Sequence, residues 1–327
     1  PKFIADRFFR LIKDEIGLVE EEFARQADSN IQVIKYLGDY LRASGGKRVR
    51  PSLLLLANKT VGGDASSENV IRLATVMEML HTATLVHDDI IDNADTRRNK
   101  ASVNSRFGNQ TAVLMGDWLY MSAFETSLKE RSLAILDILT ELTRKMTEGE
   151  LVQLTVLGRT DITEAKYFDI LQRKTAFLFS ACSEIGAILG NSNEEEQKAL
   201  RNYGINLGTA FQLADDLFDF TSTKEVIGKA AGADLLEGKV TLPLILLVEA
   251  DKSYVKKLET IMLDGEYKGT SREDLLENLQ SCGALEKTKL VAHDFAGKAR
   301  KNLEIFPETE YRSALEEIPT FMIERSK

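Results

Sequence analysis

Proline is scarce in this chain, and its scarcity restricts the possible folds more than any other feature of the sequence. Five prolines occur among the 327 residues, at positions 1, 51, 243, 307 and 319. A proline inside a helix removes a backbone hydrogen bond and clashes with the preceding turn, so stretches without proline are free to form long helices. The segment between Pro51 and Pro243 is such a stretch.

Apolar residues recur at intervals of three and four positions along much of the chain, which is the spacing of one face of an α-helix. This pattern predicts helices over residues 66–98, 111–128, 132–156, 163–189, 193–220, 241–250 and 284–305. Ser66 and Ser67, followed by Glu68, are typical of the start of the first of these helices. No segment shows the clear alternation of a β-strand, so we predict an all-α fold.

The connections between the predicted helices are short and contain glycine, as at residues 44–46, 62–63 and 190–191. Residues 221–238 form a longer connection with three glycines and are a candidate active-site lid. No linker or charge run divides the chain, and a bundle of long helices can occupy its whole length. We therefore expect residues 1–327 to form one domain.

The composition excludes several classes of protein. With 43% hydrophobic and 28% charged residues, the chain can bury a large core. Its two cysteines, Cys182 and Cys282, have no CxxC spacing, which argues against disulfides and cysteine zinc sites. A net charge of −9 argues against nucleic acid as a partner. Neither an export signal nor an apolar stretch of ~20 residues is evident, so we expect a soluble, cytoplasmic protein.

The pattern TAxxxxDDxxD occurs twice, at residues 82–92 and 209–219, late in two predicted helices. Within each copy the first and last aspartates are four residues apart, so they share one helix face. The first copy continues a stripe of residues that faces the core, formed by Met77, Leu80, His81, Thr84, Asp88 and Asp92. The two copies can therefore face each other across a bundle, and whether they arose by duplication or by convergence stays open.

Carboxylates at the edge of a core repel each other and lose hydration, so they are stable as anions only beside cations. Mg²⁺ meets this need because it prefers a few carboxylates together with substrate phosphates and water. For one motif alone, an acidic helix face in solvent is the alternative. Two copies in matched apolar surroundings favour metal binding.

Basic residues flank the first motif and suit an anion of high charge. Residues 45–50 are GGKRVR, and Arg97 and Arg98 follow Asp92. Glycine lets the backbone approach a phosphate closely, while arginine and lysine bind its oxygens. Taken alone, the run 47–50 is more typical of surface charge, but beside motifs that need Mg²⁺ it indicates a diphosphate site.

Further candidates are polar residues within or beside apolar helices, namely His81, Lys174, Thr175, Gln212, Lys229 and Lys239. A buried lysine is rare without a partner, which favours a role for Lys174. His81 can bind a phosphate or a carboxylate, or it is a hydrogen-bonded core histidine. Lys229 and Lys239 lie in a polar segment, where a solvated side chain is the strong alternative.

The segments GGKRVRP, HTATLVHDDIIDNADTRR, KT and FQLADDLFDF, in this order and with similar spacing, resemble the trans-isoprenyl diphosphate synthases, and among them the long-chain polyprenyl diphosphate synthases. The resemblance covers residues 41–249 and is specific because the two aspartate motifs come with flanking arginines, whereas the last third adds only compatible helices. It implies a helical bundle around a deep central pocket, a homodimer, and Mg²⁺ ions that bridge both motifs to an allylic diphosphate.

The same resemblance implies roles for individual residues. The implied principal metal ligands are Asp88, Asp92 and Asp215, with Asp89, Asp216 and Asp219 nearby. The residues implied for isopentenyl diphosphate are Lys47, Arg50, His81 and Arg98. Those implied for the allylic diphosphate are Arg97, Lys174, Thr175, Gln212, Lys229 and Lys239. The implied catalytic set is Asp88, Asp92, Arg97, Lys174 and Asp215.

The implied reaction is ionisation of an allylic diphosphate such as farnesyl or geranylgeranyl diphosphate, attack by the double bond of isopentenyl diphosphate, and loss of a proton. Ala83 and Thr84 stand where short-chain relatives often carry aromatic side chains, so we expect an open tunnel and a long all-trans product. A short-chain product is the alternative. Leu139 is a candidate for the floor of the tunnel, although packing in the core is its favoured role.

Two other functions are to be separated by experiment. A terpene cyclase shares the first aspartate motif, but its usual second metal motif is of an Asn/Ser/Glu type, where this chain has DDLFD at residues 215–219. A non-catalytic partner subunit can lose its metal ligands, whereas both motifs are whole here. Contact with a membrane for product release stays open, because no amphipathic anchor is evident.

Overall fold

Long helices packed side by side make up the protein. The structure is a computed structural model that describes residues 8–36, 48–97, 100–221 and 232–324. Its main helices are α2 (Lys13–Gln26), α4 (Val49–Thr60), α5 (Glu68–Ile91), α6 (Val103–Phe107), α7 (Asn109–Ser127), α8 (Leu133–Val156), α9 (Glu164–Leu171), α10 (Phe177–Leu189), α11 (Glu194–Thr221), α13 (Ala233–Leu236), α14 (Leu242–Ala250), α15 (Tyr254–Asp264), α16 (Arg272–Ser281), α17 (Ala284–Lys301) and α18 (Glu310–Glu324). The prediction of an all-α fold is confirmed.

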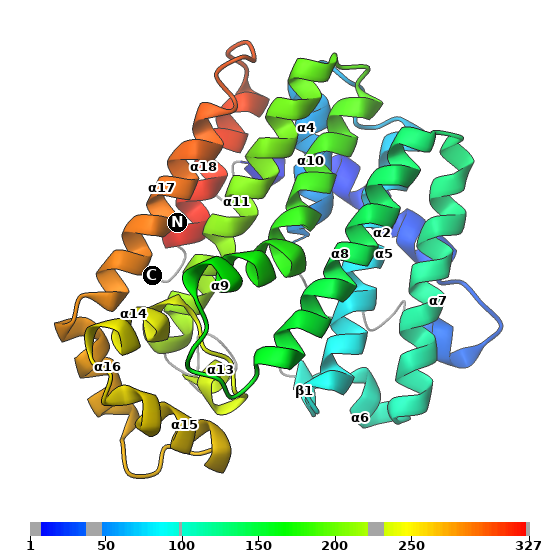
Figure 1. Ribbon diagram of the computed structural model, residues 1–327. Coiled ribbons are helices and arrows are strands. Elements are labelled where there is room, and N and C mark those ends of the chain that lie inside the picture. Colours follow the sequence, from blue (N-terminus) through cyan, green and yellow to red (C-terminus); the bar gives the residue numbers. More distant parts are fainter. Residues whose placement is uncertain (1–7, 37–47, 98–99, 222–231, 325–327) are drawn as a thin grey trace.

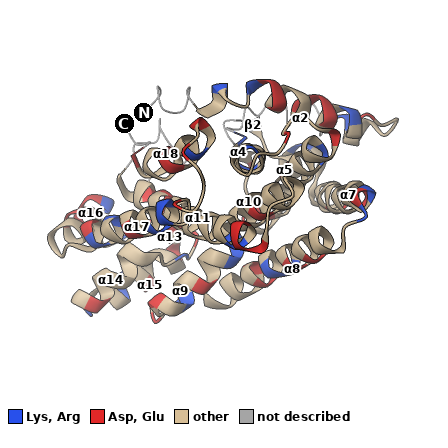
Figure 2. Ribbon diagram, turned by 90° about the horizontal axis from the view of Figure 1, so that it is seen from above, with Lys and Arg blue, Asp and Glu red and all other residues tan. Residues whose placement is uncertain are grey.

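The bundle has a main body and a smaller group of helices at one end. In Figure 1, α5, α7, α8, α10 and α11 lie beside one another, with α17 and α18 along one side. Helices α13 to α16 gather at the lower end, below α9 and α11. Charged residues follow α2 and α16 along their length, as Figure 2 shows from above. No described helix combines the length and the apolar character needed to cross a membrane.

The first predicted helix is shorter than its apolar pattern suggested. Helix α5 ends at Ile91 instead of reaching residue 98, because Asn93 takes a left-handed backbone conformation with φ of 50°. Residues Thr96–Arg97 (β1) and Lys100–Ala101 (β2) then pair as two very short antiparallel strands. Two residues are too few to show an alternation, so the sequence pattern could not reveal these strands, and the all-α fold is unaffected.

The cap of α5 also differs in detail from the prediction. Ser67 occupies the N-cap position, but its hydroxyl donates to the carbonyl oxygen of Asp64 at 2.6 Å instead of accepting from the first turn. By contrast, the side-chain oxygen of Ser132 accepts from the backbone N–H of Ile135 at the start of α8. A hydroxyl that accepts from a first-turn N–H supplies a partner that the helix lacks.

The helix predicted over residues 163–189 contains a wide turn. Residues Gln172–Ala176 form a π-helix (η2) between α9 and α10, and a short 3₁₀-helix, η1 (Leu128–Glu130), follows α7. Helix α8 packs against η2 at Gly149. A β-carbon there would lie 2.7 Å from the β-carbon of Arg173 and 3.1 Å from Cγ of Lys174, so only glycine permits this approach.

Two hydrophobic clusters form the core. The first joins α4, α5, α7, α8 and α10, and it includes the four consecutive leucines 53–56 of α4, all of them buried. The second joins the C-terminal half of α11 with α9, α14, α15, α16 and α17. Gly204 lets α11 approach α10, because a β-carbon there would lie 2.5 Å from the carbonyl oxygen of Phe179. Of the two aspartate motifs, one lies on α5, in the first cluster, and the other lies on the C-terminal half of α11, in the second cluster.

Three other predictions can be placed against the structure. Of the candidate lid at 221–238, residues 222–231 lie outside the described residues, and the remainder includes α13. Cys182 and Cys282 are both free thiols. The assignment of the whole chain to one domain stays a prediction.

Candidate functional site

The first aspartate motif lies at the C-terminal end of α5. Asp88 is in the last turn, and Asp92 is the C-cap residue, whose N–H donates to the carbonyl oxygen of Asp88 at 2.8 Å. Both side chains are half-buried, whereas Asp89 is buried, so the two partly accessible carboxylates are the pair four residues apart. A helix C-terminus carries partial negative charge and disfavours carboxylates. This end of α5 therefore calls for a cation.

Helix α7 borders the first motif with Tyr120. Burial raises the pKa of Tyr120 to about 12, and the carboxylates of Asp88 and Asp117 add to the shift. Next to it, Nε2 of His87 lies 3.0 Å from the carbonyl oxygen of Val113 and 3.5 Å from Oδ1 of Asp117. His87 thus holds α5 to α7, while the carboxylate of Asp88 in the first motif contributes to the raised pKa of Tyr120.

The second motif lies near the C-terminal end of α11 and is more deeply buried. Asp215 is half-buried, but Asp216 is buried and accepts hydrogen bonds from the hydroxyl of Tyr167 and, at 3.0 Å, from Nε2 of Gln212. Burial and the nearby carboxylate of Asp234 raise the pKa of Asp216 to about 7. The donors from Tyr167 and Gln212 oppose this shift without cancelling it.

Asp219 ties the second motif to the helix that follows it. Its carboxylate accepts from the backbone N–H groups of Ala233 at 3.2 Å and Asp234 at 3.4 Å, at the start of α13. Its own carbonyl oxygen accepts from the N–H of Gly232 at 2.6 Å. Burial and the charge of Asp234 raise the pKa of Asp219 to about 7. The last aspartate of the motif is therefore a structural anchor for α13.

Lys239 connects the first motif with the segment that follows the second motif. Its Nζ lies 2.7 Å from Oε2 of Glu237 and 3.5 Å from Oδ1 of Asp92. Burial acts to lower the pKa of Lys239, but the carboxylates of Asp92 and Glu237 outweigh it and the net shift is upward. Because Lys239 follows α13 and Asp92 ends α5, the segment after the second motif reaches the first motif at this point.

Lys174 and Thr175 both lie in η2, where the wide turn carries them toward different partners. Nζ of Lys174 lies 2.5 Å from Oε2 of Glu150 on α8. The hydroxyl of Thr175 donates to Oε1 of Gln212 on α11 at 3.0 Å. Glu150 is thus the protein partner of the half-buried Lys174, whose predicted role in the site stays a prediction. π-Helical turns of this kind occur often at functional sites.

The two arginines of the basic run at the start of α4 have different surroundings. The guanidinium of Arg50 lies 5.0 Å from the ring centre of Phe179 and 5.7 Å from that of Phe211, the neighbour of Gln212. Arg48 instead pairs with Glu20 and, at 2.8 Å, with Glu78. Arg50 therefore points between α10 and α11, whereas Arg48 joins α4 to α2 and α5.

Several predicted site residues are not placed. Lys47, Arg98 and Lys229 lie outside the described residues, as does the side chain of Arg97, whose backbone forms part of β1. His81 is half-buried on α5. The roles of these five residues, like those of the other predicted site residues, stay predictions.

The residues predicted to control product length differ in accessibility. Ala83 and Leu139 are fully buried in the first core cluster. Thr84 is half-buried, and its hydroxyl donates to the carbonyl oxygen of His81 at 2.6 Å. Of the three, only Thr84 combines partial exposure with the helix face of Asp88, four residues further on.

The carboxylates fit a metal that arrives with its substrate better than a resident one. Among the described residues, no group of three or more His, Cys, Asp or Glu side chains is close enough to hold an ion alone. Asp88, Asp92 and Asp215 instead offer partly accessible carboxylates from two helices. Burial and the nearby charge of Asp234 raise the pKa values of Asp216 and Asp219, so a cation close to them would be stabilising. Mg²⁺ takes few protein carboxylates and completes its shell with phosphates and water, so the donor set fits it.

Sequence reasoning missed the partners of the predicted residues. Tyr167, Glu150 and Asp234 were not singled out, although they contact or perturb Asp216, Lys174 and Asp219. Asp234 carried a signal, since it is an acidic residue in the candidate lid five positions before Lys239. Tyr167 and Glu150 carried none, because they lie on helices whose relative rotation no spacing along the chain reveals.

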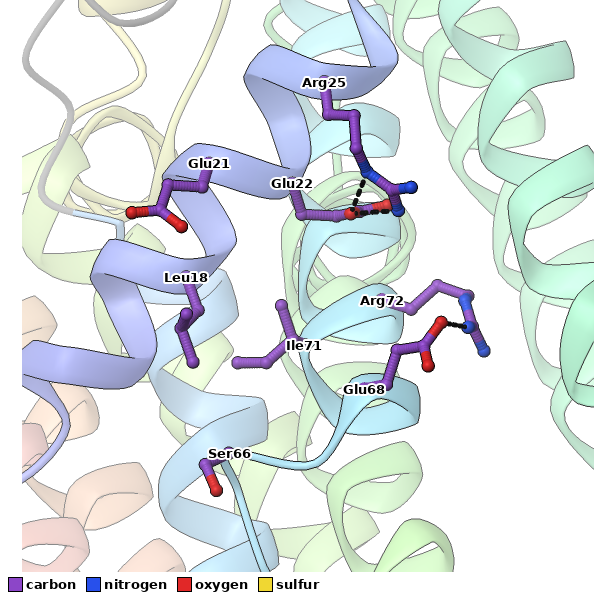
Figure 3. Close-up of a pocket in the computed structure, with 8 residues that line it drawn as sticks. All are labelled: Leu18, Glu21, Glu22, Arg25, Ser66, Glu68, Ile71 and Arg72. Atoms are coloured by element: carbon purple, nitrogen blue, oxygen red, sulfur yellow. Dashed lines mark hydrogen bonds and ion pairs between the residues drawn. The ribbon is translucent and has the colours of Figure 1, made fainter.

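A hollow near the N-terminal end of α5 is a different place. It has a volume of about 320 Å³ and lies between α2 and α5, with Leu18 and Ile71 at its apolar side (Figure 3). Two pairs of its charged residues interact, Arg72 with Glu68 and Arg25 with Glu22, the latter at 2.9 Å between Nε and Oε2. Glu68 lies about 30 Å along the helix axis from Asp88 at 1.5 Å per residue, so this hollow is remote from the motifs.

Comparisons with known proteins agree with the site. A family model described as polyprenyl synthetase matches residues 31–279. The octaprenyl diphosphate synthase of Escherichia coli strain K12 is 37% identical over 323 residues, which are 98% of this chain and 99% of that relative. A geranylgeranyl diphosphate synthase of Methanosarcina mazei is 35% identical over 291 residues, 88% of each chain.

A solved structure gives the same result at the level of the fold. A polyprenyl synthase from Caulobacter crescentus CB15, complexed with calcium and isoprenyl diphosphate, matches with a TM-score of 0.93 and 37% identity. The match covers 99% of this chain and 98% of that one, so the likeness continues well beyond residue 249, where the resemblance seen in the sequence ends. The chain therefore belongs to the polyprenyl synthetase family and is a trans-prenyltransferase, as its two aspartate motifs predicted.

Proposed function

We propose that this chain condenses isopentenyl diphosphate with an allylic diphosphate, farnesyl or geranylgeranyl diphosphate, and repeats the step to form a long-chain all-trans polyprenyl diphosphate. The observation that carries the proposal is the position of Lys239, whose ammonium lies 3.5 Å from Asp92 at the end of α5. A half-buried cation between Asp92 of the first motif and Glu237, in the segment that follows the second motif, marks the place where a diphosphate and its metal ions would be held.

Asp88, Asp92 and Asp215 are the proposed principal ligands of Mg²⁺. When bound, Mg²⁺ would neutralise charge on the departing diphosphate as a Lewis acid. The relative complexed with calcium and isoprenyl diphosphate supports a divalent cation at such a site. The half-buried carboxylates of this chain supply the oxygen donors, and waters and phosphate oxygens supply the rest.

Lys174, Thr175, Gln212 and Lys239 are the described residues proposed to bind the allylic diphosphate, together with Arg97 and Lys229. An ammonium group has three donors, so Lys174 can keep its ion pair with Glu150 and still donate to a phosphate oxygen.

Arg50 and His81, with Lys47 and Arg98, are proposed to bind isopentenyl diphosphate. The rings of Phe179 and Phe211 hold the plane of the Arg50 guanidinium, which prepares its fork of donors for a phosphate.

The chemistry then follows from placement and exclusion of water. The bond between the allylic carbon and the diphosphate oxygen breaks, and its electron pair leaves with the diphosphate. The double bond of isopentenyl diphosphate attacks the resulting cation, and a proton is lost to give the trans product. The apolar walls that α5 and α10 present protect the cation from water, which would otherwise capture it.

We propose a long product because no aromatic side chain occupies positions 83 and 84 before Asp88. The 37% identity to an octaprenyl diphosphate synthase supports this length. A short-chain product is the alternative, because the chain is also 35% identical to a geranylgeranyl diphosphate synthase.

A homodimer is proposed from the outer face of α7. Leu114 and Met121 are seven residues apart on this helix, with 67% and 63% of their surfaces exposed, and Leu128 follows at the same interval. Exposed apolar side chains in such a row favour burial against a second copy. We place the enzyme in the cytoplasm, which accords with its two free thiols, and contact with a membrane for release of the product stays open.

The direct test is to incubate the purified chain with Mg²⁺, isopentenyl diphosphate and farnesyl diphosphate, and to size the products by chromatography and mass spectrometry. We expect a ladder that ends at a long polyprenyl diphosphate. Asp88→Asn keeps the shape of the side chain but removes its charge, so turnover should fall by at least about 100-fold. Asp294→Asn, at an exposed pair with Lys298 on α17, is the matched control and should leave turnover unchanged.

Each other outcome points to one alternative. Farnesyl diphosphate left unextended under these conditions would contradict the long-chain assignment. A cyclic hydrocarbon would favour a terpene cyclase. Turnover that appears only after a second protein is added would identify the chain as a partner subunit.

A further inference from the structure

The buried carboxylate of Asp216 is held by protein donors on both of its oxygens. The hydroxyl of Tyr167 on α9 donates to Oδ2, and Nε2 of Gln212, one turn earlier on α11, donates to Oδ1 at 3.0 Å. Only 4% of the surface of Asp216 is exposed, whereas the preceding residue, Asp215, is half-buried. Adjacent residues on a helix point about 100° apart, so the two carboxylates have different surroundings.

A chain of hydrogen bonds continues from Asp216 to the π-helical turn. The amide of Gln212 donates from Nε2 to Asp216, and its Oε1 accepts from the hydroxyl of Thr175 at 3.0 Å. With the amide turned over, Oε1 would face a carboxylate oxygen, and two acceptors would meet without a proton between them. The carboxylate therefore selects one orientation of the Gln212 amide, and that orientation receives the Thr175 proton.

We propose that Asp216 is a positioning residue and not a metal ligand, and that Tyr167 completes it by anchoring the carboxylate from α9. In this arrangement Asp216 fixes the Gln212 amide, which in turn fixes the hydroxyl of Thr175. Since the Thr175 proton is committed to Gln212 in this arrangement, Thr175 has to turn from Gln212 before it can donate to a diphosphate oxygen, so Asp216 sets the starting geometry of both side chains. Tyr167 has no contact with substrate in this account and acts through Asp216 and Gln212.

This inference rests on the proposed function, and its test separates the two. Tyr167→Phe, Asp216→Asn and Asp215→Asn would be compared for steady-state kinetics with farnesyl diphosphate. Binding of inorganic diphosphate would be measured by calorimetry at a series of Mg²⁺ concentrations, as a readout that needs no turnover. Tyr203→Phe is the matched control, because its buried hydroxyl donates to the carbonyl oxygen of Leu315 at 2.7 Å, away from both motifs.

Loss of a positioning partner should lower kcat by about 10- to 100-fold in Tyr167→Phe and Asp216→Asn. The Mg²⁺ concentration that gives half-maximal binding of diphosphate should stay within about twofold of wild type in both, while Asp215→Asn raises it by about tenfold or more. The double variant that combines Tyr167→Phe with Asp216→Asn should be no slower than the slower of the two single variants, since both residues act on one chain of hydrogen bonds. Tyr203→Phe should lower the melting temperature without changing kcat.

The inference fails if Asp216→Asn raises the Mg²⁺ requirement as Asp215→Asn does, because Asp216 would then be a ligand. It also fails if Tyr167→Phe behaves like Tyr203→Phe, with a lower melting temperature and unchanged kcat. Failure of the proposed function has a different signature. In that case the wild-type chain itself would show neither elongation nor Mg²⁺-dependent binding of diphosphate.

Discussion

Carboxylates that lack compensation dominate the chemistry of individual residues in this protein. Asp216 and Asp219 are held by neutral donors, while burial and the nearby carboxylate of Asp234 raise both pKa values to about 7. Lys239 offsets part of this charge, but it is shared with Asp92 and Glu237. The second motif is therefore destabilising in its ionised form until further positive charge arrives.

In protein treated with a chelator, the free energy of unfolding should depend on pH because the ionised second motif is destabilising. An unperturbed aspartate has a pKa of 3.8, against about 7 in the folded chain, so between these values the folded state binds protons that the unfolded state does not. The contribution of Asp216 to the free energy of unfolding should rise as the pH falls from about 7 to about 4, by at most about 1.4 kcal/mol per pH unit.

Denaturant unfolding of wild type and Asp216→Asn across this range measures the contribution as a difference. We expect the advantage of the variant to be largest above pH 7 and to vanish near pH 4. A difference that is constant with pH would contradict the assignment of the raised pKa to this residue.

Thr84 is the residue at which product length should be most sensitive. It is half-buried and four positions before Asp88, so an aromatic ring there extends along the side of α5 that carries the motif. Thr84→Phe should shorten the longest product seen by mass spectrometry while elongation continues. Ala83→Phe is the contrasting variant, because Ala83 is fully buried and overpacking there should cost about 1–3 kcal/mol of stability. Unchanged product length in Thr84→Phe would remove Thr84 from the tunnel wall.

Among the elements, the helices were predictable where apolar periodicity alone decides the structure. Helices α8 and α11 begin and end within one residue of the predicted 132–156 and 193–220. The end of α5 was not predictable, because its pattern continues past Asn93 while the backbone turns there. The turn at η2 was equally hidden, since a π-helical turn has no composition of its own and depends on packing against α8.

Gly149 should be required for the position of η2. Its replacement by alanine would bring a β-carbon to 2.7 Å from Cβ of Arg173 and 3.1 Å from Cγ of Lys174. We expect Gly149→Ala to displace Lys174 and thereby to lower kcat by about 10- to 100-fold, as the loss of a supporting contact does. Gly297→Ala in α17 is the control, because nothing lies within 4 Å of its β-carbon and helix stability should rise by about 0.5–1 kcal/mol. Equal kinetics for the two variants would argue against the importance of this approach.

At the scale of the whole molecule, the last third of the chain contributes more than compatible helices. The hydroxyl of Tyr267 donates to the carbonyl oxygen of Gly232 at 3.0 Å, and Nη2 of Arg272 donates to that of Phe220 at 3.2 Å. Both contacts hold the chain on either side of residues 222–231. The motifs of the first two thirds identified the family, but these supports join residues 35 and 52 positions apart and leave no pattern in the sequence.

Assembly is also a property of the whole molecule, and α7 is where we expect it to be decided. Met121→Glu should convert a dimer to a monomer in light scattering, because a charge buried at an apolar contact without a partner is strongly unfavourable. Leu263→Glu on α15 is the control, since Leu263 is 87% exposed and lies outside the proposed contact. A dimer that survives Met121→Glu would exclude this face of α7.

The π-helical turn has a consequence for how members of this family are aligned. Such a turn holds one residue more than an α-helical turn would, so a relative without it is one residue shorter between Tyr167 and Phe177. A gap of one position placed elsewhere in that comparison would match Lys174 with the wrong residue and rotate the assigned helix face by about 100°. The insertion, and not the helix around it, fixes which side chains of α9 and α10 are equivalent between relatives.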